Sequence, residues 1–505
     1  MSSKIFNVNK SAHIKKSAFN LSHERKMSGK MGVLMPVLCQ EVVPGDKFHI
    51  DTESMVRFAP MVAPIMHRIN SYIHYFYVPN RITLPDWESF VTGTEMVLPT
   101  IDLNGQGAYQ GSIADCLGIP QGPFVTSEKI NDLPFRAFWQ IYKDYYIDEN
   151  LSTLSIGGVD QPVFNKTWDF MVENFGTAFT AIFFAANPFY RCWEKDYFTS
   201  ALPWAQKGNP VYMKPTGKPS LALRDEDAAI ETGNLSVDAL GRMIGGSGSE
   251  MYLADGVRIE VEEMRRAVRL QKFLERNARA GTRYVEHLLA HWGVKSSDAR
   301  LQRAEYIGGG KSPIVISEVL NMTGTADLPQ GNMSGHGINV GRTNHASKFC
   351  EEHGFIIGIM SIMPEPTYQQ GLPKMWSRSL NLDFYYPEFA QLGEQPVLNK
   401  ELYCDPLEGG GVNDETFGYQ SRYAEYKYMP STVHGHFKDS LDFWHAGRKF
   451  KNLPALTNEF IQCNAEEINQ RIFAVTDPLA ENLYIQLYHK ITAVRPMPYF
   501  NTPNL

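Results

Sequence analysis

The chain has 505 residues, of which 43% are hydrophobic and 20% are charged. This composition is ordinary for a globular protein and excludes wholesale disorder. The net charge of −7 argues against a protein that coats nucleic acid through its overall charge. The cysteines lack a CxxC pair, which excludes a disulfide framework or a zinc site of the usual spacing. They are Cys39, Cys116, Cys192, Cys350, Cys404 and Cys463.

Nothing in the sequence indicates export or a membrane span. The first residues, MSSKIFNVNK, lack the apolar centre of a secretory signal. The most apolar run, Ala178 to Ala186, is too short to cross a bilayer. We therefore expect a protein made in a reducing cytoplasm, with free cysteines and no membrane insertion.

The segment 1–30 is polar, basic and without an apolar period. Such a segment is typical of a mobile arm, and a frayed terminus is the simpler alternative. We predict a basic N-terminal arm over 1–30 and a folded domain over 31–505. Against the single acid Glu24, the arm carries the cations Lys4, Lys10, Lys15, Lys16, Arg25, Lys26 and Lys30.

Strand patterns begin after this arm. Val33–Val43 is apolar with an internal proline, which favours an extended edge segment, and Pro44-Gly45-Asp46 marks a turn. Phe48–Phe58 alternates apolar and polar residues, as a half-buried strand does. Arg68–Val78 is dense in aromatic and β-branched residues and predicts a further strand.

Helices are predicted in the middle of the chain. Pro85–Gly93 and Asn131–Ile147 have helical character, and Ile259–Ala280 carries a broad apolar stripe that predicts a long helix. Gly281 is expected to stop that helix, and Thr282 is expected to cap a second one through Trp292. We therefore expect a helical insertion over 259–292.

The segment 205–250 has the strongest loop character, and a long segment of this kind is usually a functional insertion. Strand character returns later in the chain. The later strands are expected at Pro313–Leu320, His353–Met363, Arg422–Met429 and Leu483–Val494. This order of elements predicts a mainly β protein with helices and long loops inserted between its strands.

Two motifs resemble chemical sites and fail on inspection. Glu305–Ser312 (EYIGGGKS) ends like a phosphate-binding loop, but its first position is glutamate, so a glycine turn before a strand is favoured. His434, His436 and His445 could bind a metal, but no carboxylate or cysteine signature completes the set, so ordinary histidines are favoured. We expect no catalytic residue, no cofactor and no metal.

Long blocks of sequence are more informative than these motifs. They include VPGDKF (43–48), RFAPMVAPIMHRINSYIHYFYVPNRI (57–82), RCWEKDYFTSALPW (191–204), LERNARAGTRYVEHLLAHWGV (274–294), DARLQRAEYIGG (298–309), TYQQGLPKMWSR (367–378), LGEQPVLNKE (392–401) and FGYQSRYAEYKYMPSTVHGHF (417–437). In this order the blocks resemble the major capsid proteins of gokushoviruses, within the Microviridae. The resemblance is faint over 94–130, 151–180 and 205–250.

The resemblance implies an eight-stranded antiparallel jelly roll of the viral capsid type, with long inserted loops and several helices. It implies self-assembly into a T=1 icosahedral shell that encloses the circular single-stranded DNA of a bacteriophage, so the protein is expected in the virion capsid. It also implies a surface protrusion, for which 205–250 is our candidate. Other phage structural or scaffolding proteins and a host surface receptor are further expected partners.

The basic arm is the candidate contact for the packaged single-stranded DNA. Basic side chains gain affinity by displacing counterions from phosphates, and Phe6 and Phe19 could stack on bases. The alternatives are a solvated tail and an arm that is swapped onto a neighbouring subunit. The hypothesis assigns this contact to Lys4, Lys10, Lys15, Lys16, Arg25, Lys26 and Lys30.

Two questions stay open in the sequence. The aromatic blocks 191–204 and 383–389 have the composition either of a core or of a subunit interface. The alternative to a capsid protein is a jelly-roll glycan-binding protein or a cupin-like enzyme, which would need a carboxylate pair or a histidine-rich metal cluster.

Overall fold

The computed structural model describes residues 15–500, except for 94–96, 104, 106, 210, 212–219, 226–227, 232–235, 238–242, 245–249, 255–260, 282, 295–301, 321–332, 407–410, 476 and 478–479. The chain divides into two compact units. The first unit is made of Met1–Pro203, Ser296–Ala390 and Pro396–Leu505, and the second of Trp204–Lys295 and Gln391–Gln395.

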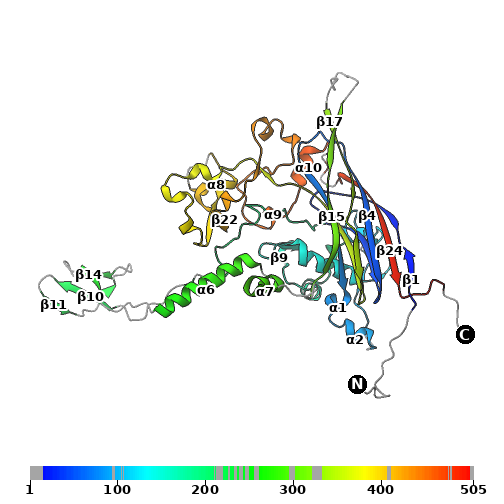
Figure 1. The fold of residues 1–505 in the computed structure, drawn as a ribbon, viewed down its shortest axis with the longest axis horizontal. Helices are drawn as coiled ribbons and strands as arrows, with labels where there is room; N and C mark the ends of the chain where they lie inside the picture. Colours follow the sequence, from blue (N-terminus) through cyan, green and yellow to red (C-terminus); the bar gives the residue numbers. More distant parts are fainter. Residues whose placement is uncertain are drawn as a thin grey trace, which may run out of the picture. The chain divides into compact units, whose positions relative to one another are not determined.

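The first unit contains a large antiparallel sheet, of which β1, β4, β17 and β24 are labelled in Figure 1. Its strand order is β1-β24-β4-β17-β16, with β2 also paired to β24 and β18 to β4. Inward and outward residues alternate along β4, so one face of this sheet is buried and the other is open. The strands are β1 (Ser17–Asn20), β2 (His23–Gly29), β4 (Lys47–Phe58), β16 (Val315–Leu320), β17 (Met333–Arg342), β18 (Ala346–Phe349) and β24 (Leu483–Arg495).

A second antiparallel sheet has the order β15-β5-β19-β3. Its strands are β3 (Met35–Val42), β5 (Ile69–Pro79), β15 (Glu305–Pro313) and β19 (Gly354–Pro364). Every residue of β19 is buried, as are all but one of β5. Continuous apolar sequence in these strands therefore corresponds to a sheet that is covered on both faces.

The two faces of this second sheet contribute to two different cores. One core is shared with the large sheet and contains Phe48, Ile50, Tyr75, Ile356 and Leu487. The other core covers the opposite face, where Phe76 and Ile357 pack with helical residues such as Trp139. The helices of that layer, α4 (Leu133–Ile141) and α5 (Trp168–Ala181), therefore close the outer side of the sheet.

Shorter elements complete the first unit. A one-turn π-helix, Tyr142–Tyr146, continues α4. The remaining helices are α1 (Asn80–Thr83), α2 (Trp87–Val91), α3 (Ile113–Leu117), α8 (Asn399–Leu402), α9 (Asn458–Ile461) and α10 (Glu466–Ile472). The remaining strands are β6 (Thr100–Asp102), β7 (Lys129–Asn131), β8 (Thr153–Ile156), β9 (Val159–Pro162), β20 (Thr367–Tyr368), β22 (Thr416–Ser421), β23 (Ser431–Thr432) and β21 (Glu394–Leu398), whose first two residues belong to the second unit. No described helix is long and apolar enough to cross a membrane.

The second unit contains the predicted helical insertion. It consists of α6 (Val261–Ala280) and α7 (Tyr284–Trp292), in agreement with the expected helices over 259–292. Arg279 near the end of α6 forms an ion pair with Glu394 of the same unit. The short strands of this unit are β10 (Ser220–Asp225), β11 (Ala228–Glu231), β12 (Ser236–Val237), β13 (Met243–Ile244) and β14 (Glu250–Ala254).

Three expectations need correction. The second half of the predicted arm is not free, because β1 and β2 pair with β24 along residues 17–20 and 23–29. The segment 205–250 is not a plain loop, because it contributes the strands of the second unit. The expected strand Arg422–Met429 is wrong, because Tyr423 adopts a left-handed backbone and a short 3-10 helix follows it.

The glycine run of EYIGGGKS is part of strand β15 and not a turn. A Cβ at Gly309 would lie 2.3 Å from the carbonyl oxygen of Ile73 on the neighbouring strand, and one at Gly308 would lie 2.8 Å from the Cβ of Ala346. The glycines therefore permit the close approach of neighbouring chain segments. A phosphate-binding loop requires a strand-to-helix turn, and this segment is an extended strand.

Candidate nucleic-acid interface and exposed apolar surface

The structure describes five of the seven cations of the predicted arm and separates them. Lys4 and Lys10 lie outside the described residues. Lys15 and Lys16 are exposed just before β1, whereas Arg25 and Lys26 are on β2 and Lys30 follows it. The five described residues therefore do not form one cluster.

Arg25 and Lys26 point to opposite faces of the large sheet, as neighbours on a strand do. Arg25 lies opposite the buried Leu487 and donates a hydrogen bond to the carbonyl oxygen of Cys116. Lys26 is exposed and forms an ion pair of 3.7 Å with Glu24. Arg25 therefore stabilises the fold, and the charge of Lys26 is partly neutralised by Glu24.

Lys16 lies at the end of the large sheet beside residues that are distant in the sequence. Its Nζ donates a 2.9 Å hydrogen bond to the carbonyl oxygen of Gly45 and lies 5.2 Å from the centre of the Phe349 ring. In the strand register, Lys47 lies between Phe349 and Val494. Lysines from two segments of the chain therefore meet at one end of the open face.

Aromatic rings accompany these lysines. Phe19 on β1 is stacked with Tyr499, with ring centres 5.9 Å apart and planes 5° apart. Tyr499, Phe500 and Phe349 are all exposed. We call Lys15, Lys16, Phe19, Lys47, Phe349, Tyr499 and Phe500 the basic-aromatic edge. Phe349 shares the open face with Lys16 and Lys47, whereas Phe19 lies opposite the buried Ala493 and faces the inner side at the same end of the sheet. Cations and exposed rings at one end of a sheet can bind phosphates and stack on unpaired bases.

A buried ion pair holds the turn beneath this edge. Asp46 is completely buried, and its carboxylate accepts the backbone N–H of Val43 at 3.0 Å and pairs with Arg495 at 3.3 Å. Gly45 in the same turn donates a backbone hydrogen bond to Cys350. The turn that presents its carbonyl to Lys16 is therefore fixed from both sides.

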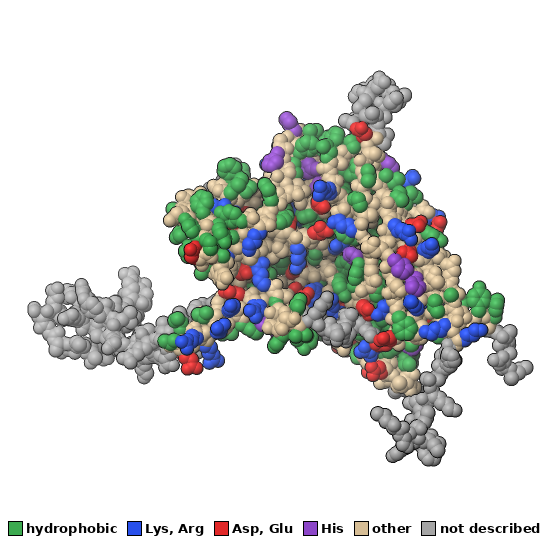
Figure 2. All heavy atoms as spheres, in the orientation of Figure 1, with side chains coloured by type: hydrophobic (Ala, Val, Ile, Leu, Met, Phe, Trp, Pro, Cys, Tyr) green, Lys and Arg blue, Asp and Glu red, His purple; other side chains and the backbone are tan. Residues whose placement is uncertain are grey.

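A second surface of the first unit is apolar and exposed. Its side chains are between 37% and 68% exposed, and most of them belong to the segment 372–386. Figure 2 shows hydrophobic side chains gathered over the lobe that carries α8 and β22. We call the following set the apolar surface: Leu372, Met375, Trp376, Leu380, Leu382, Phe384, Tyr385, Tyr386 and Tyr426.

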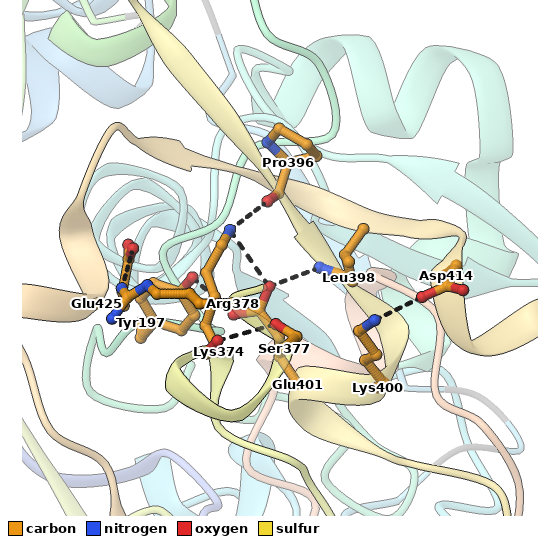
Figure 3. A network of polar contacts seen from close by, with 10 residues as sticks. All are labelled: Tyr197, Lys374, Ser377, Arg378, Pro396, Leu398, Lys400, Glu401, Asp414 and Glu425. Atoms are coloured by element: carbon orange, nitrogen blue, oxygen red, sulfur yellow. Dashed lines mark hydrogen bonds and ion pairs between the residues drawn. The ribbon is translucent and has the colours of Figure 1, made fainter. Parts of the chain in front are cut away.

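Polar contacts hold the base of the apolar surface (Figure 3). Arg378 is mostly buried, pairs with Glu425 at 2.9 Å and lies 4.3 Å from the centre of the Tyr426 ring. Lys374 pairs with the buried carboxylate of Glu401 at 3.5 Å, and Glu401 accepts a hydrogen bond from Tyr197. These contacts connect the apolar segment to the folded core below it.

Local hydrogen bonds fix the chain within the apolar surface. The Asp383 carboxylate accepts the backbone N–H groups of Ser379 and Leu380, each at 2.8 Å. These two bonds lower the pKa of Asp383 below its usual value, so the side chain stays ionised and keeps the turn closed. Rings pack edge-on between Tyr385 and Tyr423, with centres 4.9 Å apart.

The structure resolves the two aromatic blocks differently. In 191–204, Trp193, Tyr197 and Phe198 are buried, and Phe198 contacts Tyr368 with ring centres 4.8 Å apart. In 383–389, the side chains of Phe384, Tyr385 and Tyr386 remain exposed. The first block is core, and the second belongs to the surface.

The histidines near 440 do not form a metal site. The Nε2–H of His445 donates to the carbonyl of Phe437 at 2.7 Å, and its Nδ1 accepts the N–H of Gly447 at 2.9 Å. Both ring nitrogens are thus occupied by backbone, and burial lowers the pKa of His445. His434 is bonded to Thr432, and the described residues contain no cluster of three or more possible metal ligands.

The sequence alone did not predict the full basic-aromatic edge or the exposure of the apolar surface. Lys47, Phe349, Tyr499 and Phe500 reach the basic-aromatic edge through strand register and ring stacking, which sequence spacing does not reveal. For the apolar surface, the density of aromatics in 383–389 was the available signal, but it did not separate surface from core.

The chain is similar to known proteins over nearly its full length. The model of the family described as capsid protein (F protein) matches residues 7–505. The capsid protein VP1 of Chlamydia phage 1 is 34% identical over 585 aligned positions, covering 98% of this chain and 96% of that protein. The capsid protein VP1 of Bdellovibrio phage phiMH2K is 34% identical, with the same coverage, and that of Spiroplasma virus 4 is 28% identical, covering 99% and 97%.

Proposed function

The chain belongs to the phage capsid protein (F protein) family, and from this premise we propose that it assembles with copies of itself into a closed icosahedral shell around single-stranded DNA. The match over residues 7–505 is the observation that carries this proposal. Its structural role as a major capsid protein of the virion and its resemblance to gokushovirus capsid proteins are confirmed. The family is one of structural proteins, so the glycan-binding and cupin-like alternatives are not favoured.

The sheet topology supports a jelly roll as the fold of the shell-forming domain. Along the chain, β2, β3, β4 and β5 alternate between the large and the second sheet. The later strands β15, β17, β19 and β24 also alternate between the two sheets, and the last of them pairs with the first of the earlier strands. The resulting orders are β2-β24-β4-β17 in the large sheet and β3-β19-β5-β15 in the second sheet. Two interlocked Greek keys of eight strands produce this arrangement.

The proposed shell has T=1 symmetry, with one subunit in each equivalent position. Closed symmetric assemblies require each subunit to bury much of its surface against its neighbours. The segment 205–250 belongs to the second compact unit, inserted between β5 and β15, which supports its role as a surface protrusion. Scaffolding proteins and a host receptor remain proposed partners.

The basic-aromatic edge is the proposed contact for packaged DNA. It supplies Lys15, Lys16 and Lys47 for phosphates and the rings of Tyr499 and Phe500 for stacking. Residues 1–14 precede this edge directly, so Lys4 and Lys10 are proposed to extend the same contact. Arg25 is removed from the proposal because its side chain is committed to Cys116.

The test replaces the lysines of the edge and measures binding to a fluorescent oligothymidylate. We expect Lys15→Gln/Lys16→Gln/Lys47→Gln to weaken binding and to reduce the salt dependence of log K by about 0.7 for each lost phosphate contact. The control Lys129→Gln/Lys438→Gln/Lys451→Gln changes exposed lysines elsewhere and the net charge equally. Equal binding by the two triple variants would contradict the proposed contact.

A further inference from the structure

We infer that the apolar surface is a subunit contact, against which a second copy of this chain packs in the shell. The inference deepens the proposed function and rests on it. It assigns a specific role to residues 372–386 and Tyr426, which pack on the core below through the polar contacts in Figure 3.

The size of the apolar surface is the first argument. Nine large apolar side chains, each between 37% and 68% exposed, present on the order of 900 Å² of surface, taking typical side-chain areas. The largest exposed apolar patch of a monomeric protein is about 300–600 Å². A stable protein interface buries about 800 Å² on each partner. The apolar surface therefore exceeds what a monomer exposes and matches what an interface needs.

The rigidity of the apolar surface is the second argument. Asp383 caps the turn at Ser379 and Leu380, and Arg378 connects the turn to Glu425 and Tyr426. Ordering of side chains on binding costs free energy, so groups that are already fixed bind more tightly. Exposed aromatic residues that are held in one arrangement before binding are typical of an interface core.

The charges around the apolar surface favour protein over nucleic acid as the occupant. Lys374, Arg378 and Lys400 each pair with a carboxylate of the same chain, at 3.5, 2.9 and 2.6 Å respectively. Paired cations release few counterions when they approach a phosphate, so this surface has little electrostatic attraction for DNA or an anionic lipid surface. Apolar groups with neutralised charges suit another protein surface.

A second copy is the occupant because a capsid subunit must bind many identical neighbours. In a closed shell, copies of the chain surround each subunit, and large obligate interfaces are more hydrophobic than transient ones. The apolar surface is hydrophobic in this way, whereas the basic-aromatic edge presents lysines beside aromatic rings, which suit phosphate and bases. We therefore assign the two surfaces to different partners.

The first experiment removes the apolar side chains without touching the polar base. We expect Trp376→Ser/Leu380→Ser/Phe384→Ser to lower the yield of particles at least roughly tenfold, because interface aromatics carry much of the binding energy. Particles are measured by gradient sedimentation and negative-stain electron microscopy after expression with the neighbouring phage genes. The control Val125→Ser/Val159→Ser removes exposed apolar groups elsewhere and is expected to assemble normally.

The outcomes separate this inference from the proposed function. Equal particle yield from the wild type and the triple variant would overturn the assignment of the surface alone. A wild-type chain that forms neither particles nor oligomers, even with the neighbouring genes, would contradict the proposed function and this inference with it.

A second experiment needs no substitution and covers the case in which the triple variant does not fold. Hydroxyl-radical footprinting compares Met375 and Trp376 in wild-type particles and in dissociated subunits. We expect both residues, which are 58% and 68% exposed in the isolated chain, to be protected in particles. Labelling that is equal in the two states would show that the surface faces solvent in the shell, for example toward a host receptor, and would overturn the inference.

Discussion

Two aromatic-rich segments of similar composition have opposite places in this molecule. The block 191–204 lies in the core, where Phe198 is 3% exposed and packs against Tyr197, Tyr368 and Phe417. The segment 372–386, which carries the apolar surface, contains Trp376, which is 68% exposed. Aromatic content alone therefore does not say whether a segment stabilises the subunit or joins it to another subunit.

The difference lies in what each segment's polar groups bind. In the buried block, the Asp196 carboxylate accepts the backbone N–H groups of Phe198 and Thr199, so these two donors are satisfied inside the core. In the exposed block, Asp383 and Arg378 satisfy the chain locally and leave the rings facing outward. The comparison predicts that substitutions in the two segments affect different properties.

The largest effect is expected in the buried block. Phe198→Ala should destabilise the subunit by about 3–5 kcal/mol, because it leaves a cavity among packed aromatic rings. Urea denaturation of dissociated subunits measures this change. If Phe198→Ala destabilises the subunit no more than Phe384→Ala, a substitution of an exposed ring, the two segments do not differ as proposed.

The next effect concerns the connection between the exposed segment and the core. Arg378→Met should cost about 2–3 kcal/mol, because it removes the ion pair between Arg378 and the mostly buried Glu425 carboxylate. The double variant Arg378→Met/Glu425→Gln serves as the control and should recover part of the loss. If both variants are as stable as the wild type, the ion pair does not hold the segment in place.

The sequence predicted the strands with clear patterns and missed those that depend on partners. Phe48–Phe58 alternates strictly and corresponds to β4, and the long apolar runs correspond to β5 and β19. The strand β2 is polar and charged, so it resembled an arm. It becomes a strand because it pairs with the edge of β24 and because Arg25 and Met27 are half-buried on the inner face.

Similar limits applied to the functional surfaces. Of the predicted cations, Lys15 and Lys16 lie at the proposed contact, but Arg25 faces inward because strand neighbours alternate between faces. Lys47 and Phe349 are about 300 positions apart in the sequence and meet through strand pairing. Contacts of this kind require the fold, whereas the family resemblance could be read from the blocks themselves.

Low pH should destabilise the subunit through a buried histidine of its core. His489 is buried, bonded to Thr52 and Val37, and burial, with smaller contributions from His23 and Arg25, lowers its pKa to about 4. In the unfolded chain this histidine binds a proton near pH 6.5. Its contribution to the free energy of unfolding is therefore fully present above that pH and is lost as the pH falls towards 4.

The expected loss from this histidine between pH 6.5 and 5.5 is about 1 kcal/mol. His489→Gln should remove that part of the pH dependence, measured by denaturation of dissociated subunits at both values. The segment 372–386 contains no histidine, so it should not add to this slope. An unchanged slope in the variant would mean that His489 is not neutral in the folded subunit.

The smallest effect on stability is expected in the exposed block. Trp376→Ser/Leu380→Ser/Phe384→Ser should change the unfolding free energy of the dissociated subunit by only about 0.5 kcal/mol, because the side chains lose little burial. The same variant should bind less of the dye ANS, which reports exposed apolar surface. Val125→Ser/Val159→Ser is the control and should leave dye binding unchanged. A large loss of stability in the triple variant would mean that these rings pack inside the subunit and that the contrast between the two blocks is wrong.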